Sequence, residues 1–159
     1  NTTTYLKNGQ INCTSRYSCI NLENSNLRTD SISLDIISAE NAISGYNNSY
    51  VKLNNSNYSC PTGSGWPSCI NVSYNSVVQV SDTEIQTVNS NGLEAQWNSN
   101  IQINNYLINR SDQGSQIHLN AHSNLQIQAG TQDLSIDCGS QTFIQNQTSV
   151  IISGACSEY

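Results

Sequence analysis

Short alternating apolar pairs recur along the whole chain. Each pair, such as Ile32 with Leu34 or Ile101 with Ile103, puts two apolar side chains on one side of an extended segment. Runs rich in Asn, Ser and Gly separate the pairs, and these residues favour turns over strand interiors. Helical periodicity is nearly missing from the sequence. The pattern therefore predicts an all-β protein built from strands of three to five residues.

The apolar pattern returns after about 24 residues, which indicates a repeat architecture. Three columns of apolar residues can be drawn, in which successive members are separated by roughly one such period. The longest separation falls in the same coil in every column, where the segment CPTGSGWPSC at 60–69 adds length. A solenoid predicts this shared irregularity, because an insertion in one coil shifts all later positions together. The columns are Ile20, Ile43, Ile70, Leu93, Ile117 and Phe143; Leu27, Val51, Val78, Ile101, Leu125 and Val150; and Leu34, Tyr58, Ile85, Ile108 and Leu134.

We therefore expect a parallel β-solenoid, or β-helix, of five to six coils with three short strands and about 24 residues per coil. A β-sandwich is the alternative, because strands about eight residues apart also occur in that fold. Residues 1–159 are expected to form a single domain. Within it, residues 1–19 are expected to be an N-terminal cap or arm, and residues 60–69 a loop insertion closed by a disulfide.

The stretch SNIQINNYLI at 99–108 resembles the repeat of right-handed parallel β-helix proteins, the pectate-lyase-like class of carbohydrate-processing and surface proteins. The segment GLEAQWNSNIQINNYLI at 92–108 extends the likeness, and DLSIDC and SVIISG echo it. The resemblance is one of fold pattern and covers about Ile20 to Ile152. In such folds Asn tolerates a left-handed backbone at bends and can form ladders between coils, which is the role expected for Asn104 and Asn105. The right-handedness is taken from the resemblance alone.

Six cysteines and eight N-glycosylation sequons indicate the compartment. An even number of cysteines without the spacing of a zinc site fits disulfides, which persist in secreted proteins. Fifteen pairings can be drawn, and we expect the local ones: Cys13–Cys19, Cys60–Cys69 and Cys138–Cys156. A chain with 24 Asn and 25 Ser makes several sequons by chance, but sequons and cysteines together favour a secreted or cell-surface glycoprotein. The sequons lie at Asn1, Asn12, Asn47, Asn54, Asn57, Asn71, Asn109 and Asn146.

The charge balance excludes two classes of partner. The chain has five Lys and Arg against eleven Asp and Glu, for a net charge of −6. Five cations cannot neutralise a row of phosphates, so nucleic acid is not an expected partner, and adhesion to anionic membranes is disfavoured. No apolar stretch approaches the roughly 20 residues of a membrane-spanning helix, so no membrane insertion is expected. We expect Asn1 to be a mature N-terminus, because the chain begins without Met or a signal peptide.

Residues with catalytic chemistry are scattered along the sequence. Enzymes of the class that the chain resembles typically cluster Asp with Arg or Lys, and no such cluster is present. Arg28 and Lys52 are an exception among the cations, because they lie one period apart and therefore stack on one face. His118 and His122, with Glu94 one period before His118, could hold zinc only if the chain turned, since residues four apart on a strand lie about 13 Å apart. We expect no catalytic residue, no metal site and no cofactor.

The function expected from the sequence is that of a structural extracellular glycoprotein, a subunit of a surface layer, sheath or fibre. Stacking of solenoid ends would assemble it, because open ends carry unpaired strand groups and head-to-tail contacts give filaments. The expected partners are therefore further copies of the chain and covalent N-glycans. The alternatives are a carbohydrate-binding or polysaccharide-cleaving β-helix module, with Trp66 as the candidate sugar contact, or a fragment of an adhesin or tailspike. Trp97 and several tyrosines could also stack on sugar rings.

Overall fold

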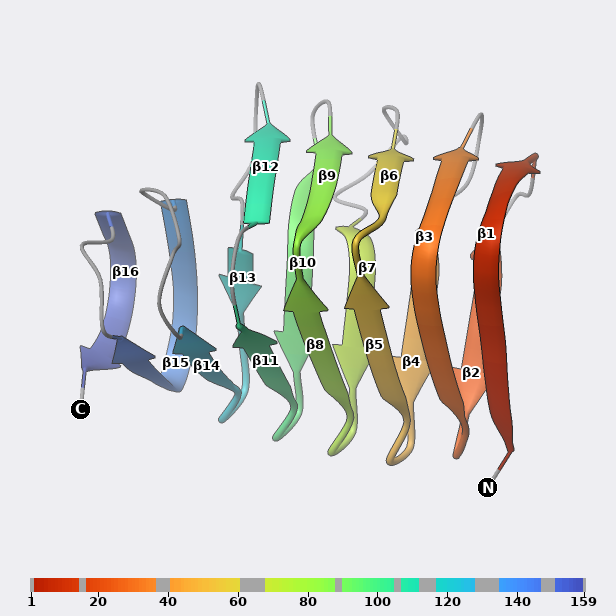
Figure 1. The fold of residues 1–159 in the computed structure, drawn as a ribbon. Coiled ribbons are helices and arrows are strands. Elements are labelled where there is room, and N and C mark those ends of the chain that lie inside the picture. Colours follow the sequence, from red (N-terminus) through yellow and green to blue (C-terminus); the bar gives the residue numbers. More distant parts are fainter. Residues whose placement is uncertain are drawn as a thin grey trace.

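The computed structural model describes residues 2–14, 17–36, 41–60, 68–87, 90–104, 107–111, 117–127, 135–146 and 151–158. Within these ranges, the side chains of residue 36 and of 107–111, 135–146 and 151–158 are not described. All described elements are β-strands, and all described strand pairs are parallel. Figure 1 shows the strands stacked along one axis, with the two termini at opposite ends. The chain is a parallel β-solenoid, as predicted, and the β-sandwich alternative is wrong.

Three faces run along the solenoid, and each is a stack of hydrogen-bonded parallel strands. Face A contains β2 (Ile20–Glu23), β4 (Ile43–Tyr46), β7 (Ser68–Ser73), β10 (Asn91–Gln96) and β13 (Ile117–Leu119). Face B contains the first part of β3 (Asn26–Ile36), β5 (Tyr50–Asn54), β8 (Val77–Ser81), β11 (Asn100–Ile103) and β14 (Asn124–Ile127). Face C contains the second part of β3, β6 (Asn57–Cys60), β9 (Thr83–Thr87) and β12 (Leu107–Ser111).

Partial coils extend the stack at both ends. At the N-terminal end β1 (Thr3–Cys13) pairs with β3 along faces B and C. At the C-terminal end β15 (Ser135–Asn146) and β16 (Ile151–Glu158) continue faces A and B. Four coils, from β2 to β12, have all three strands among the described residues, which is fewer than the predicted five to six. The difference arises because the columns also counted the coils after β12, for which no third strand is among the described residues.

The register confirms the first five members of the columns on faces A and B. The sixth member is wrong in both, because the coil after Ile117 is shorter than the period that the columns assumed. Ile117 pairs with a residue 19 positions later, and so does Leu125. The residues that complete the two columns are Ile136 in place of Phe143 and Ile144 in place of Val150.

The column on face C is confirmed for its first three members and wrong at the fourth. Leu34 pairs with Tyr58 and Tyr58 with Ile85, as predicted. Ile85 then pairs with Asn109, so that Ile108 lies one position out of register, opposite an outward residue of β9. A shift by one residue exchanges the two faces of a strand, which is why apolar identity alone misassigned this position. The last predicted member, Leu134, lies outside the described residues.

Stacked apolar side chains fill the interior. Large aliphatic side chains from successive coils, such as Ile43, Val51 and Ile101, are fully buried. Burial of one such side chain contributes roughly 1.5–3 kcal/mol, and each relies on the coil above and below for its cover. The core therefore exists only because the coils stack. Tyr58 is the one fully buried aromatic ring among the described residues.

The bends between faces place residues in the left-handed region, as the sequence predicted for Asn. At the corner between faces B and C, one residue per coil has positive φ: Asn8, Ser31, Asn55 and Asp82. At the corner between faces A and B, the first coil has one residue with positive φ, Asn24, and each of the next four coils has a pair: Asn47 and Asn48, Tyr74 and Asn75, Trp97 and Asn98, and Ala121 and His122. Asn104, for which a left-handed backbone was expected, follows the end of β11 without a positive φ, and its amide donates to the Val80 carbonyl at 3.0 Å. Asn105, predicted at the same bend, lies outside the described residues.

A ladder of buried serines, rather than asparagines, links the coils at the corner between faces A and B. The backbone amide of Ser49 donates to the hydroxyl of Ser76 at 3.0 Å. The backbone amide of Ser76 donates in the same way to the hydroxyl of Ser99 at 3.2 Å. The hydroxyls in turn donate to a carbonyl of their own coil, as Ser76 does to Ser73 at 2.7 Å. Among the described residues, one Asn–Asn side-chain hydrogen bond joins coils, from Asn124 to Asn100 at 2.9 Å.

Two of the three predicted disulfides are confirmed. Cys13 is bonded to Cys19, with their Cα atoms 6.0 Å apart, and Cys60 to Cys69, with their Cα atoms 5.6 Å apart. The first bond ties the end of β1 to the start of β2, and the second closes the inserted loop between β6 and β7. The third predicted bond, Cys138–Cys156, rests on side chains outside the described ones.

Candidate functional site

The corner between faces A and B carries a pair of stacked aromatic rings. Tyr74 and Trp97 occupy equivalent positions in neighbouring coils, where the amide of the residue after Tyr74 donates to the Trp97 carbonyl at 3.0 Å. Their ring centroids are 5.9 Å apart, and the ring planes differ by 4°. About half of each side chain is exposed, at 51% and 50%. The next equivalent position holds Ala121, so no ring continues the stack there.

This arrangement suits contact with an apolar surface that also has polar edges. Offset-stacked rings hold each other rigid, and Tyr and Trp each combine a large apolar body with a hydrogen-bonding tip. The C–H faces of a sugar ring present that combination. The sequence had named Trp97 among several aromatic residues but singled out Trp66, which lies outside the described residues.

Two other tyrosines, Tyr58 and Tyr50, have hydroxyl groups that are hydrogen-bonded within the chain. Tyr58 is buried, and its hydroxyl shares a hydrogen bond of 2.7 Å with that of Thr29. Burial raises the pKa of Tyr58 well above its ordinary value of 10.0, although hydrogen bonds with Thr29 and Ser56 lower it in part. Tyr50 donates from its hydroxyl to Gln79, and partial burial raises its pKa as well. The Tyr58 ring therefore offers no face to a ligand from solvent, whereas Tyr50 is half-buried at an outward position of β5.

Face A brings Glu94 and His118 together, as their spacing of one period predicted. The two residues are direct partners in the register of β10 and β13. Glu94 is 7% exposed, and its carboxylate accepts hydrogen bonds that account for its burial. His118 contacts Asn91 through Nδ1 at 3.2 Å. The donors to Glu94 are the side chains of Ser68, Asn71 and Gln96.

The chain turns between His118 and His122, so the two histidines belong to different parts of the coil. His122 lies at the corner with φ of 66°, on an exposed turn, whereas His118 lies in a strand of face A. Within the described ranges, no group of three or more His, Cys, Asp or Glu side chains could hold a metal ion. With its carboxylate already hydrogen-bonded, Glu94 is a satisfied structural group on face A.

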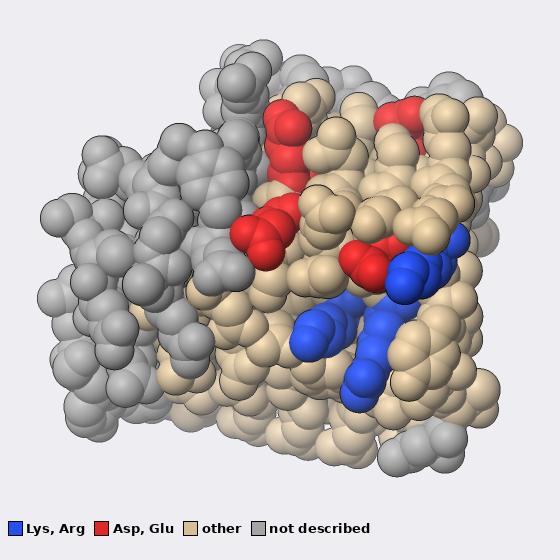
Figure 2. Space-filling model, viewed as in Figure 1, with Lys and Arg blue, Asp and Glu red and all other residues tan. Residues whose placement is uncertain are grey.

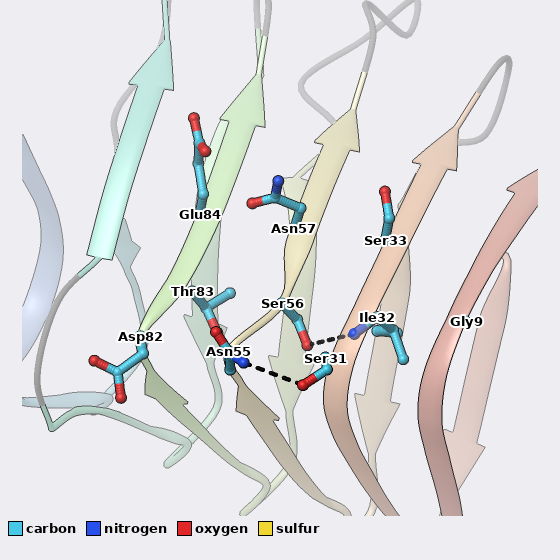
Figure 3. A pocket seen from close by; sticks show the side chains of 10 residues that line it. All are labelled: Gly9, Ser31, Ile32, Ser33, Asn55, Ser56, Asn57, Asp82, Thr83 and Glu84. Carbon is cyan, nitrogen blue, oxygen red and sulfur yellow. Dashed lines mark hydrogen bonds between the residues drawn. The ribbon is translucent and has the colours of Figure 1, made fainter.

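A shallow cavity of about 600 Å³ follows the corner between faces B and C (Figure 3). Its hydroxyl and amide groups are used to hold the corner. The Asn55 side chain donates to the Ser31 hydroxyl at 3.1 Å, and the Ile32 amide donates to the Ser56 hydroxyl at 3.3 Å. The Ser31 hydroxyl also donates to the Asp30 carboxylate at 3.3 Å, so these groups of the cavity are already paired with neighbours at the corner. The lining residues are Gly9, Ser31, Ile32, Ser33, Asn55, Ser56, Asn57, Asp82, Thr83 and Glu84.

The cations Arg28 and Lys52 lie opposite each other on face B, as the sequence predicted. Figure 2 shows the basic side chains gathered in one area of this face, with acidic side chains to one side of them, toward the top of the view. Lys7 joins them from β1. This cluster contains all the Lys and Arg side chains that the structure describes.

The sequons differ in accessibility. Asn12 and Asn57 are exposed, whereas Asn47, Asn54 and Asn71 are half-buried. The serine of the Asn47 sequon is Ser49 of the buried ladder, and that of the Asn54 sequon is the buried Ser56. A glycosyltransferase that reads these hydroxyls would have to act before the coil closes. The side chains of Asn1, Asn109 and Asn146 lie outside the described ones.

The sequence columns missed both the serine ladder and the stacked rings, because they followed only inward apolar residues. A signal for both was present. The dipeptide Asn-Ser ends the bend in four coils, and an aromatic residue precedes it in two of them. The dipeptides are Asn24–Ser25, Asn48–Ser49, Asn75–Ser76 and Asn98–Ser99.

Comparison with known proteins adds no relative. No protein-family model, curated protein sequence or solved structure matches the chain. The likeness to pectate-lyase-like proteins is therefore one of fold pattern, and the right-handedness taken from it stays a prediction. A search of the described residues for a helix long and apolar enough to cross a membrane finds none.

Proposed function

We propose that the chain is a structural glycoprotein of the extracellular space or cell surface, whose copies stack end to end into a layer, sheath or fibre. The observation that carries the proposal is the outer edge of β1. This strand has 11 residues, and among the described residues it pairs with β3 alone. A parallel strand paired on one side leaves a row of N–H and C=O groups that can template another strand.

The edge of β1 has few of the features that protect edge strands. Proteins usually block such edges with charges, prolines or short strand length. The sequence TTYLKNGQINC contains one charge, Lys7, and no proline. Leu6 and Ile11 are only partly buried where they pack against the end of the core. A further coil laid on this edge would complete their burial, at roughly 25 cal/mol for each Å² of apolar surface covered.

A second copy in head-to-tail orientation fits this edge. All described strands are parallel, so the C-terminal strand of one copy can continue the same sheets on the next. β16 ends faces A and B at one end, while β2 and β1 begin those faces at the other. Because the two ends differ, the contact does not close on itself, and repetition gives a filament.

The charge distribution favours the same orientation. Residues 1–52 contain four Lys and Arg and four Asp and Glu, for a net charge of 0. Residues 53–159 contain one Arg and seven Asp and Glu, for a net charge of −6. Head-to-tail contact brings the acidic part of one copy to the neutral part of the next, whereas tail-to-tail contact would bring two acidic parts together.

The disulfides Cys13–Cys19 and Cys60–Cys69 are compatible with an extracellular location. Exposed sequon residues such as Asn12 and Asn57 are accessible for N-glycans. Glycans on the faces would hinder association there and leave the ends as the surfaces of contact. Asn12 lies on β1 itself but on its outward side, so a glycan there would project away from the edge that stacks.

Light scattering on the secreted chain over a hundredfold range of concentration tests the assembly. We expect the mean mass to rise with concentration, and electron microscopy to show unbranched particles. A constant monomer mass at all concentrations would refute end-to-end stacking. Mass spectrometry before and after removal of N-glycans tests the glycoprotein separately, since an unchanged mass excludes glycans without bearing on assembly.

A second candidate function is carbohydrate binding, and the stacked pair Tyr74–Trp97 is the observation that favours it. An exposed, rigid pair of rings on the corner can pack against the C–H face of a sugar. A glycan array probed with the monomeric chain is the test. Binding to neutral glycans would support carbohydrate binding, and an array without any bound glycan would exclude it.

A further inference from the structure

Three cations from neighbouring strands line one cavity at the N-terminal end of face B. The cavity has a volume of about 320 Å³, and Lys7, Arg28 and Lys52 contribute to its wall. Small-molecule sites in proteins start at about this size. The chain has only five Lys and Arg and a net charge of −6, so three cations in one place run against its overall composition.

The register brings the cations close together. Arg28 of β3 is the direct partner of Lys52 of β5, and Tyr5 of β1 is the direct partner of Arg28. Adjacent strands are about 4.8 Å apart, so the bases of the two charged side chains are separated by about that distance. Beyond Lys52 the same outward row contains only neutral amides: Gln79, Gln102 and Gln126.

The guanidinium of Arg28 is held in place. Its Cζ lies 5.7 Å from the centroid of the Tyr5 ring, which is the geometry of a cation–π contact. Such a contact supports one face of the planar guanidinium and leaves N–H donors at its edge for a ligand. An arginine fixed in this way loses little conformational freedom when it binds an oxyanion in a bidentate manner.

The carboxylate of Asp30 also lines the cavity, and among the described residues it forms an ion pair with Lys7 and none with Arg28 or Lys52. Asp30 accepts hydrogen bonds from Asn54 at 3.1 Å and from Ser31 at 3.3 Å, and its second oxygen lies 3.6 Å from Lys7 Nζ. Within the described part of the chain, this contact with Lys7 is the single Lys or Arg ion pair. Arg28 and Lys52 therefore face each other as like charges in cross-strand register, which is unfavourable in a sheet.

We infer that the cavity between Tyr5, Arg28 and Lys52 is a binding site for a small ligand with an oxyanion group, either a sulfate or phosphate or a carboxylate. The ligand oxygens accept hydrogen bonds from the edge of the Arg28 guanidinium and from the Lys52 ammonium. Its negative charge removes the repulsion between the two cations, so binding stabilises the fold. Lys7 lies at the rim of the site, where its charge is shared with Asp30.

Thermal unfolding of the full chain with inorganic sulfate, inorganic phosphate or sodium acetate tests the site, with sodium chloride at the same ionic strength as the reference. We expect at least one oxyanion to raise Tm saturably above the chloride value, since ligand that binds only the folded state stabilises it. Sulfate and phosphate acting alone identify a tetrahedral ligand group, and acetate acting alone a carboxylate. Equal Tm values in all four salts would mean general screening and would overturn the inference.

Substitutions test whether the oxyanion-dependent rise in Tm comes from this cavity. Arg28→Gln is expected to weaken oxyanion binding about tenfold or more, because a charge-assisted hydrogen bond is lost. Arg110→Gln, which removes the same charge from β12 on face C, is the matched control and is expected to leave binding unchanged. An equal loss in both variants, or none in Arg28→Gln, would show that the cavity is not the site. Lys52→Glu gives a second measure: it should raise Tm without any oxyanion, by pairing with Arg28, and abolish the oxyanion response.

Discussion

The backbone amide of Ser49 donates a hydrogen bond of 3.0 Å to the hydroxyl of Ser76, one coil further along the solenoid. That hydroxyl donates in turn to the Ser73 carbonyl at 2.7 Å, and the Ser76 side chain is fully buried. Removal of the hydroxyl would leave the Ser49 amide buried without a partner. We therefore expect Ser76→Ala to lower the free energy of unfolding by about 1–3 kcal/mol.

Urea denaturation measures this loss. The matched control is Ser33→Ala, which removes a half-buried, outward hydroxyl from β3. We expect the control to change the free energy of unfolding by less than about 0.5 kcal/mol. Equal losses in the two variants would show that the serine ladder does not link the coils.

The repeat and its faces could be predicted from sequence because they depend on inward apolar residues. Ile43 and Val51 are recognisable without any knowledge of the rest of the fold, and the register confirms their columns. The columns failed at Phe143 and Ile108, where a shorter coil and a one-residue shift left apolar identity unchanged. Where the length of the coil varies, the apolar pattern alone does not determine which residues pair between strands.

The surface features depend on contacts between coils, and single residues do not reveal them. Ser76 is an ordinary turn residue until the period aligns it with Ser49 and Ser99. Tyr74 and Trp97 likewise form a pair only because both take the same corner position. The stacking of Arg28 on Lys52 could be predicted, since the two residues are one period apart. The contact of Arg28 with Tyr5 could not be predicted, because it depends on the pairing of β1 with β3.

Burial of Tyr58 makes the stability of the protein fall in alkaline solution. Burial raises the pKa of Tyr58 above its ordinary value of 10.0, so the unfolded chain loses this proton at a lower pH than the folded chain. The stabilising contribution is complete below about pH 10 and is lost as pH rises from there toward the folded-state pKa. We expect Tm to fall more steeply above about pH 10 in the native sequence than in Tyr58→Phe.

The Tyr58→Phe variant should also be less stable near neutral pH, by about 1 kcal/mol, because the hydrogen bond with Thr29 is lost. Tyr17→Phe, at a tyrosine that is 67% exposed, is the control and should keep the alkaline slope of the native sequence. Identical slopes for the native chain and Tyr58→Phe would mean that another group governs alkaline unfolding.

The disulfide between Cys13 and Cys19 holds the end of β1 against the rest of the solenoid. Replacement of both by serine should cost about 2 kcal/mol of stability, from the entropy of the opened loop. Hydrogen exchange should show lost protection in β1 and retained protection in β5 and β8. The matched variant, with Cys60 and Cys69 replaced by serine, should cost a similar amount and leave β1 protected. Equal exchange in β1 for both variants would contradict this assignment.

Stacking of solenoid ends should be blocked by one charge on the inward side of β1. Ile11 is the partner of Leu34 in the register and packs partly against the core. In Ile11→Lys the ammonium would have to be buried between two copies, so we expect the mean mass by light scattering to stay at the monomer value. Gln10→Lys adds the same charge on the outward side of the strand and should assemble normally. Assembly of both variants would exclude β1 as the contact surface.

Loss of one ring from the stacked pair should weaken binding of neutral sugars. Trp97→Ala suits the test, because Ala121 takes the equivalent corner position with a positive φ of 50° and the backbone should therefore be kept. For any glycan identified on the array, we expect an affinity about fivefold weaker or more in Trp97→Ala, since an aromatic contact is worth about 1 kcal/mol or more. Tyr17→Ala removes an exposed ring far along the chain from the pair and should bind normally. Titration calorimetry measures the three affinities, and unchanged binding by Trp97→Ala would place any sugar site elsewhere.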